Sequence, residues 1–216
     1  MNIDPITLDS IEKYIHYLSE HIEINALIMP RSNKIKDKIE HKSDLDNAQY
    51  HEFISFADYH YFISRILFMN HLYLYSLFAG QQCIENYLKA FIKYKDQTPD
   101  EIHPLSILLE TCKKIANKTD DFILSNEIVT IIYKYEPFNE IPRYPVTKTT
   151  LNGWGCLYPN DIYILDYFVF KFRELLPFPK QYHNIMEENH IYITSCKNDS
   201  PDVYKMFIDG NINFSK

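Results

Sequence analysis

One row of polar residues in an otherwise apolar helix is the strongest chemical signal in this sequence. Gln81, Glu85 and Lys89 recur at four-residue intervals in the stretch SLFAGQQCIENYLKAFI, residues 76–92. Residues four apart lie above one another on a helix, so these three side chains are predicted to share one face. A carboxylate can organise hydrogen bonds there, and an ammonium can contact an anion. The alternative is a solvated Glu–Lys pair, which contributes only about 0.2–0.5 kcal/mol.

A glycine beside this row indicates a close approach by another part of the structure. Gly80 precedes Gln81 in mid-helix, where glycine costs roughly 1 kcal/mol relative to alanine. A close neighbour would explain that cost. We therefore interpret the row either as a polar seam against another helix or subunit, or as a small pocket for a polar ligand.

The elements that must position this row are predicted to be helices. Apolar residues at helical spacing predict helices at residues 8–27, 50–69, 72–94, 105–112, from 120 onwards, and 160–176. The polar pair Asn70 and His71 predicts a bend between the second and third of these. We therefore expect the two longest helices to run antiparallel.

The remaining segments are predicted to be less regular. Residues 136–160 contain four prolines and the sequence NGWG, which indicates a long loop. In the tail, HIYIT alternates, and Asp209-Gly210 separates two apolar runs, a pattern typical of a β-hairpin. We predict an all-α bundle of about five helices with an N-terminal helical extension and a small C-terminal β-hairpin tail. The expected division is 1–48, 49–177 and 178–216.

Composition limits the class of protein. The 216 residues are 46% hydrophobic and 15% aromatic, which is sufficient for a packed core. The net charge of -7 argues against a protein that coats nucleic acid by bulk electrostatics, although a local basic pocket is compatible with it.

No cofactor, metal or membrane signal is found in the sequence. Four cysteines lie far apart, without the paired spacing of a zinc ribbon, and no glycine-rich phosphate loop occurs. The start of the chain lacks the pattern of a signal peptide, and no apolar stretch reaches membrane-spanning length. We therefore expect no metal, no cofactor, no membrane contact and a cytoplasmic location.

Three blocks of sequence, in order, resemble the HEPN domain family. They are FAGQQCIENYLKAFI, HPLSILLETC and YEPFNEIPRYP, and the resemblance covers about residues 50–176. It implies an all-α bundle that forms a homodimer, with polar residues in a cleft at the interface. Many members are metal-independent ribonucleases, including toxins of toxin–antitoxin pairs, whereas others are thought to bind nucleotides or RNA without cutting them.

The sequence departs from the ribonuclease pattern of this family. That pattern places His four to six residues after Arg, near the start of the last core helix, but after Arg143 no His occurs before His183. Arg65 and His71 have a similar spacing, yet they lie one helix too early. They are weak catalytic candidates, and a surface or interhelix contact is the alternative.

Six residues are the candidate ligand-binding set: Gln81, Glu85, Lys89, His103, Arg143 and Tyr144. Lys89 and Arg143 can contact a phosphate, although Arg143 can equally pair with Glu85. Tyr144 can stack on a base or pack on the bundle. His103 can bind a ligand, help to cap the helix that follows it or contact an interface.

Three hypotheses follow. The first is a non-catalytic HEPN-like homodimer that binds a nucleotide or RNA segment in a polar cleft. The second is a ribonuclease, such as a toxin, that uses unorthodox residues. The third is an interaction module in which the row serves dimerisation only and the C-terminal tail docks a protein partner. The missing Arg-to-His spacing places the first and third ahead of the second.

Overall fold

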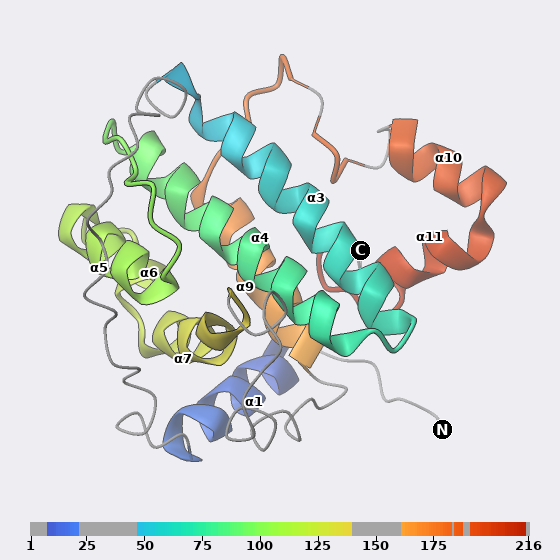
Figure 1. Cartoon of the computed structure of the whole chain (residues 1–216), viewed down its shortest axis with the longest axis horizontal. Coiled ribbons are helices and arrows are strands. Elements are labelled where there is room, and N and C mark those ends of the chain that lie inside the picture. The colour runs from blue at the N-terminus through green and yellow to red at the C-terminus, as the bar shows by residue number, and fades with distance from the viewer. Residues whose placement is uncertain (1–7, 22–46, 140–160, 183, 188–190, 215–216) are drawn as a thin grey trace.

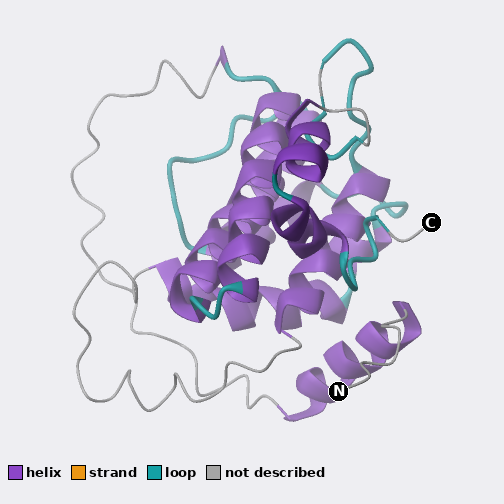
Figure 2. Ribbon diagram, turned by 90° about the vertical axis from the view of Figure 1, so that its right-hand side faces the viewer, coloured by secondary structure: helices purple, strands orange, loops and turns teal. Residues whose placement is uncertain are grey.

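Helices make up every regular element in the residues that the computed structural model describes, which are 8–21, 47–139, 161–182, 184–187 and 191–214 (Figure 2). They are α1 (Leu8–His21), α3 (Tyr50–Met69), α4 (Tyr73–Tyr94), α5 (Leu105–Ile115), α6 (Asp121–Leu124), α7 (Asn126–Tyr135), the short 3-10 helix η2 (Glu136–Asn139), α9 (Asp161–Leu175), α10 (Ile191–Asp199) and α11 (Pro201–Ile208). The prediction of a helical bundle is confirmed.

The antiparallel pair α3 and α4 forms the centre of the bundle (Figure 1). The bend predicted between them is confirmed: His71 has a φ of 62°, in the left-handed region, and the chain reverses there. Within the pair, the Ser64 hydroxyl donates to the Ser76 carbonyl oxygen at 2.9 Å. This fixed register determines which residues of α3 lie opposite the polar row of α4.

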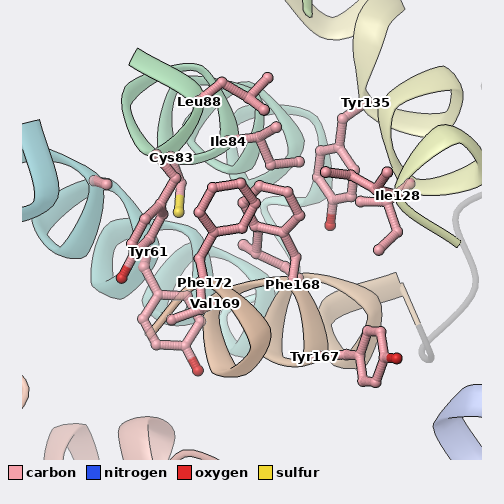
Figure 3. Packing of buried hydrophobic residues seen from close by; sticks show 14 of the residues in the cluster. Tyr61, Cys83, Ile84, Leu88, Ile128, Tyr135, Tyr167, Phe168, Val169 and Phe172 are labelled. Atoms are coloured by element: carbon pink, nitrogen blue, oxygen red, sulfur yellow. The ribbon is translucent and has the colours of Figure 1, made fainter. Parts of the chain in front are cut away.

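Helix α9 packs across the α3–α4 pair and supplies much of the core (Figure 3). Phe168 and Phe172 of α9 are fully buried together with Cys83, Ile84 and Leu88 of α4. Burying a side chain of this size contributes about 1.5–3 kcal/mol, so this contact stabilises the whole arrangement. Helices α5 and α7 complete the bundle around α4.

The N-terminal helix α1 packs on the bundle, as Figure 1 shows. It buries Ile11 and Ile15 and contacts α7 and α9. The rest of the predicted first helix, residues 22–27, lies outside the described residues. In the part of the chain that the structure describes, no helix combines the length and apolar character needed to cross a membrane.

The predicted C-terminal hairpin is wrong, because helices α10 and α11 occupy the described part of that segment. Gly210 has a φ of 64° and follows the end of α11, where the Asp209 amide donates to the Lys205 carbonyl oxygen at 2.8 Å. A residue with positive φ ends many helices as well as forming many hairpin turns. The Asp-Gly pair was therefore correctly located as a reversal and wrongly assigned to strands.

The helix predicted from residue 120 is divided in two. Helix α6 ends at Leu124, and α7 begins after Ser125, whose hydroxyl accepts a hydrogen bond from the Ile128 amide at 3.4 Å. Serine in this position favours a new helix start, since it satisfies an amide that has no partner within the helix.

Candidate functional site

The polar row of α4 is buried in the bundle. Gln81, Glu85 and Lys89 are 0%, 3% and 7% exposed, so the interpretation as a solvated pair does not hold. Charged groups at this burial require partners, because removing them from water costs several kcal/mol. The partners come from α4 itself and from the segment before α5, and we call Gln81, Gln82, Glu85, Lys89 and His103 the Glu85 cluster.

The carboxylate of Glu85 organises this cluster. Its Oε1 accepts from Lys89 Nζ at 2.7 Å and contacts His103 Nδ1 at 3.0 Å. Its Oε2 accepts from the side-chain amides of Gln81 and Gln82, each at 3.4 Å. Burial raises the pKa of Glu85, but the hydrogen bond from His103 and the charge of Lys89 outweigh burial and hold it below its usual value. The cluster therefore contains an ionised carboxylate.

His103 is fixed in its tautomer by this carboxylate. An ionised carboxylate only accepts hydrogen bonds, so the proton of a neutral His103 lies on Nδ1, towards Glu85. The backbone carbonyl oxygen of His103 accepts from Gln81 Nε2 at 3.3 Å, which holds the segment against α4. The side chain is 52% exposed, and its Nε2 is the nitrogen left for an outside partner.

Lys89 retains hydrogen-bonding capacity. An ammonium carries three N–H donors, and within the described ranges Glu85 is the hydrogen-bond partner of Lys89. The side chain is 9% exposed. The remaining donors can therefore contact the oxygen atoms of an anion without giving up the Glu85 contact.

The close neighbour predicted for Gly80 is confirmed, and it is Tyr135 of α7. A Cβ atom at Gly80 would lie 2.5 Å from Tyr135 Cε1, closer than real Cβ contacts allow. The Tyr135 hydroxyl donates to the Asp161 carbonyl oxygen at 3.1 Å and so connects α7 with the start of α9. Gly80 thus serves packing within the bundle next to the site.

Arg65, a weak catalytic candidate, is fully buried and fully engaged. Its guanidinium pairs with Asp166 of α9, and its Nε and Nη2 donate to the carbonyl oxygens of Met206 and Asp209 at 3.0 and 2.7 Å. Arg65 thus makes an interhelix contact, which was the alternative to a catalytic role. We call Arg65, Asp166, Tyr61 and Asn213 the Arg65 cluster.

The second catalytic candidate has different surroundings. His71 is exposed in the α3–α4 turn, where its Nδ1 lies 2.6 Å from the Tyr73 hydroxyl. The structure thus gives Arg65 and His71 separate partners. Arg143 and Tyr144 lie outside the described residues.

Two residues near Glu85 were not identified as candidates from the sequence patterns. Gln82 donates to Glu85 and to Gln81, and its position beside Gln81 in a Gln-Gln pair was the available signal. His60 of α3 is close enough for the charge of Glu85 to act on it: burial lowers the pKa of His60, and Glu85 opposes that shift. No signal in the sequence placed His60 near Glu85, because their proximity depends on the register of α3 against α4.

No group of three or more His, Cys, Asp or Glu side chains in the described portion of the chain is arranged to hold a metal ion. At the Glu85 cluster, an anion can contact Lys89, and a hydrogen-bond donor can contact His103 Nε2.

Comparison with known proteins gives one match. The family model of the HEPN domain matches residues 50–154, a range that includes α3, α4, α5 and α7 and ends before α9. No curated protein and no solved structure matches the chain.

Proposed function

Because residues 50–154 match the family model of the HEPN domain, we propose that the protein is a non-catalytic homodimer that binds a nucleotide or an RNA segment through the Glu85 cluster. The observation that carries this proposal is the buried Lys89 ammonium, which contacts Glu85 and has N–H donors left over. A buried cation whose remaining N–H groups can donate favours contact with an anion.

The small net charge of the pair Glu85 and Lys89 means that a phosphate would need a second cation. Glu85 offsets the charge of Lys89, so this pair carries little net charge. We propose that Arg143 supplies the second cation, since its planar guanidinium suits two oxygen atoms of one phosphate. Tyr144 is proposed to stack on the base of the same ligand.

The homodimer is proposed to form through the exposed face of α3. Phe56, Tyr59 and Ile63 recur at helical spacing on this face and are 62%, 51% and 45% exposed. Large apolar side chains gathered on one face are typical of an interface. His60 lies on the same helix and is near Glu85, so a partner seated here would adjoin the Glu85 cluster.

Calorimetry with a panel of nucleotides and a short single-stranded RNA tests the binding proposal. Lys89→Ala is expected to weaken binding by about 1.5–3 kcal/mol, the value of a charge-assisted hydrogen bond, or roughly 10- to 150-fold. Lys118→Ala is the matched control, because Lys118 is exposed and follows the C-terminal end of α5, whereas His103 precedes the start of that helix. Failure of the wild type to bind any of these ligands would contradict the proposal and favour the interaction module.

Light scattering tests the dimer. The wild type is expected to be a dimer at micromolar concentration, and Ile63→Glu, which places a charge on the proposed interface, is expected to be a monomer. Lys118→Glu is the control for the added charge. A monomeric wild type would contradict this part of the proposal.

A ribonuclease is the second candidate, and one observation favours it. Glu85 orients His103 with Nε2 towards solvent and Lys89 nearby, an arrangement that could transfer a proton beside a phosphate. We expect purified protein to leave single-stranded RNA uncut, because no Arg-to-His motif accompanies Arg143. Cleavage that is lost in His103→Ala but kept in His71→Ala would instead establish this candidate.

A further inference from the structure

The polar row of α4 continues beyond the Glu85 cluster towards a pocket. Lys93 follows Lys89 at the same four-residue spacing, about 6 Å farther along the helix. Beyond Lys93, a pocket of about 530 Å³ is lined by Gln49, Tyr50, Lys93, Tyr94, Asp96, Gln97 and Thr98. Its volume lies in the range of small-molecule sites, about 300–1,000 Å³.

The pocket is built where α4 ends beside the start of α3. Asp96 has a φ of 57°, and the Gln97 amide donates to the Ile92 carbonyl oxygen at 3.1 Å, so the chain turns sharply after the helix. This turn places Asp96 and Gln97 next to Gln49, the residue that caps α3. Two helix termini thus form the walls.

Tyr50 and Tyr94 form an aromatic wall of the pocket, and the segment at Pro177 holds Tyr50 in place. The rings of Tyr50 and Tyr94 meet edge to face, with centroids 5.3 Å apart, and the Tyr50 hydroxyl donates to the Pro177 carbonyl oxygen at 3.0 Å. Tyr94 is nevertheless 38% exposed. An aromatic ring that is fixed and accessible suits the stacking of a planar group.

The polar lining indicates which part of a nucleotide fits. The amide of Gln97 can donate to and accept from a base edge, and the Asp96 carboxylate accepts from an amino group. The same carboxylate repels a phosphate, so the pocket favours a base. Lys93, at the side of the row, is the lining residue suited to a phosphate.

We propose that this pocket is a second subsite, which binds one base of an RNA strand whose phosphates follow Lys89 and Lys93. The proposal rests on the proposed function and narrows its ligand from a mononucleotide to an oligonucleotide. A row of cations beside an aromatic ring is how proteins bind single strands without strong sequence preference. One helical turn between the two lysines lets consecutive parts of a strand reach them.

Binding of a short single-stranded RNA and of a mononucleotide to the full chain, each with wild type and variants, tests this subsite. The RNA is expected to bind more tightly than the mononucleotide. Tyr94→Ala is expected to weaken RNA binding about 5- to 100-fold, in line with the loss of one stacked base, and to leave mononucleotide binding unchanged. Tyr94→Phe keeps the ring and is expected to bind as the wild type does.

Lys93→Ala gives a second, independent measurement. It is expected to weaken RNA binding and to reduce the salt dependence of that binding, because one phosphate contact is lost. Lys114→Ala, on exposed α5 surface, is the matched control. Thermal melts of Tyr94→Ala confirm that the variant is folded when its binding is compared.

The outcomes separate the two proposals. Mononucleotide binding that depends on Lys89, with RNA bound no more tightly, would overturn the second subsite alone. The second subsite would also be overturned if Tyr94→Ala weakened the binding of both ligands equally, or of neither. Absence of any binding by the wild type would overturn the proposed function and the subsite with it.

Discussion

The Arg65 cluster and the Glu85 cluster both place charged side chains inside the bundle, but they differ in how completely those charges are paired. In the Arg65 cluster, both charged side chains are 0% exposed, and three guanidinium nitrogens have acceptors. Asp166 also accepts from the Tyr61 hydroxyl at 2.6 Å. In the Glu85 cluster, the carboxylate is equally well satisfied, yet among the described residues the ammonium of Lys89 donates to Glu85 alone.

The two clusters also differ in what covers them. Backbone carbonyl oxygens from the end of α11 close the Arg65 cluster, and Asn213 donates to the Tyr61 hydroxyl at 3.1 Å. The Glu85 cluster ends at His103, half of whose side chain is exposed. A buried ion pair that is saturated by its own chain stabilises or specifies the fold, whereas one with unused donors near the surface can bind a ligand.

The largest loss of stability is expected when the Arg65 cluster is disrupted. Arg65→Met leaves Asp166 buried without a cation and removes the contacts to α11, so stability is expected to fall by about 3–5 kcal/mol. Urea denaturation measures this change. The double variant Arg65→Met with Asp166→Leu is expected to recover part of the loss, since no charge then remains unpaired. A loss below about 1 kcal/mol for the single variant would contradict the distinction between the clusters.

Asp58 provides an intermediate case, a buried carboxyl that contacts no cation. Its Oδ1 accepts from the Tyr87 hydroxyl at 2.6 Å, and its Oδ2 has no hydrogen-bond partner among the described residues. Burial raises the pKa of Asp58 from 3.8 to about 7, against the opposing effects of Arg173 and Tyr87. The folded protein therefore binds this proton more tightly than the unfolded chain.

The contribution of Asp58 to stability is thus fully present below pH 3.8 and is lost as the pH rises towards about 7. The free energy of unfolding is expected to fall by up to about 4 kcal/mol over this pH range, at about 1.4 kcal/mol per pH unit. Asp58→Asn is expected to remove this pH dependence, because asparagine does not titrate. Urea denaturation of both proteins across this pH range measures the difference, and parallel curves would contradict the shifted pKa.

A smaller effect is expected for Glu85→Ala. The variant leaves Lys89 and His103 without their shared acceptor, but the half-exposed His103 side chain can regain water. Stability is expected to fall by about 1–3 kcal/mol, and nucleotide or RNA binding is expected to fall with it. Glu85→Gln, which keeps the shape and one acceptor oxygen, is expected to lose less stability. Thermal melts and calorimetry measure the two properties separately.

The sequence correctly predicted features that depend on residues only a few positions apart. The row Gln81, Glu85 and Lys89 lies on one helix, and a bend does separate α3 from α4 at Asn70 and His71, because helical periodicity and turn chemistry operate over a few residues. The Asp-Gly signal failed, since positive φ is required by a helix end as well as by a hairpin turn.

Local sequence patterns could not predict contacts between residues that are far apart in the chain. Arg65 and Asp166 are 101 residues apart, and the carbonyl oxygens that complete the Arg65 cluster are 141 and 144 residues away. Arg65 was therefore only a weak catalytic candidate, with a surface or interhelix contact as the alternative, and its partners could not be named. His103 was a candidate from its own surroundings, but its contact with Glu85 depends on how the segment before α5 folds back onto α4.

The smallest effect on stability is expected for Lys89→Ala, and this variant distinguishes the two clusters most directly. Glu85 would keep its contacts with His103, Gln81 and Gln82, so its carboxylate remains hydrogen-bonded after the ammonium is removed. We expect the free energy of unfolding to fall by about 1 kcal/mol, the net value of one hydrogen bond, in contrast to Arg65→Met, while ligand binding is weakened. Thermal melts, light scattering and calorimetry on one preparation test this. A loss of stability as large as that of Glu85→Ala would make Lys89 structural, and loss of the dimer without loss of stability would make the row an interface between subunits.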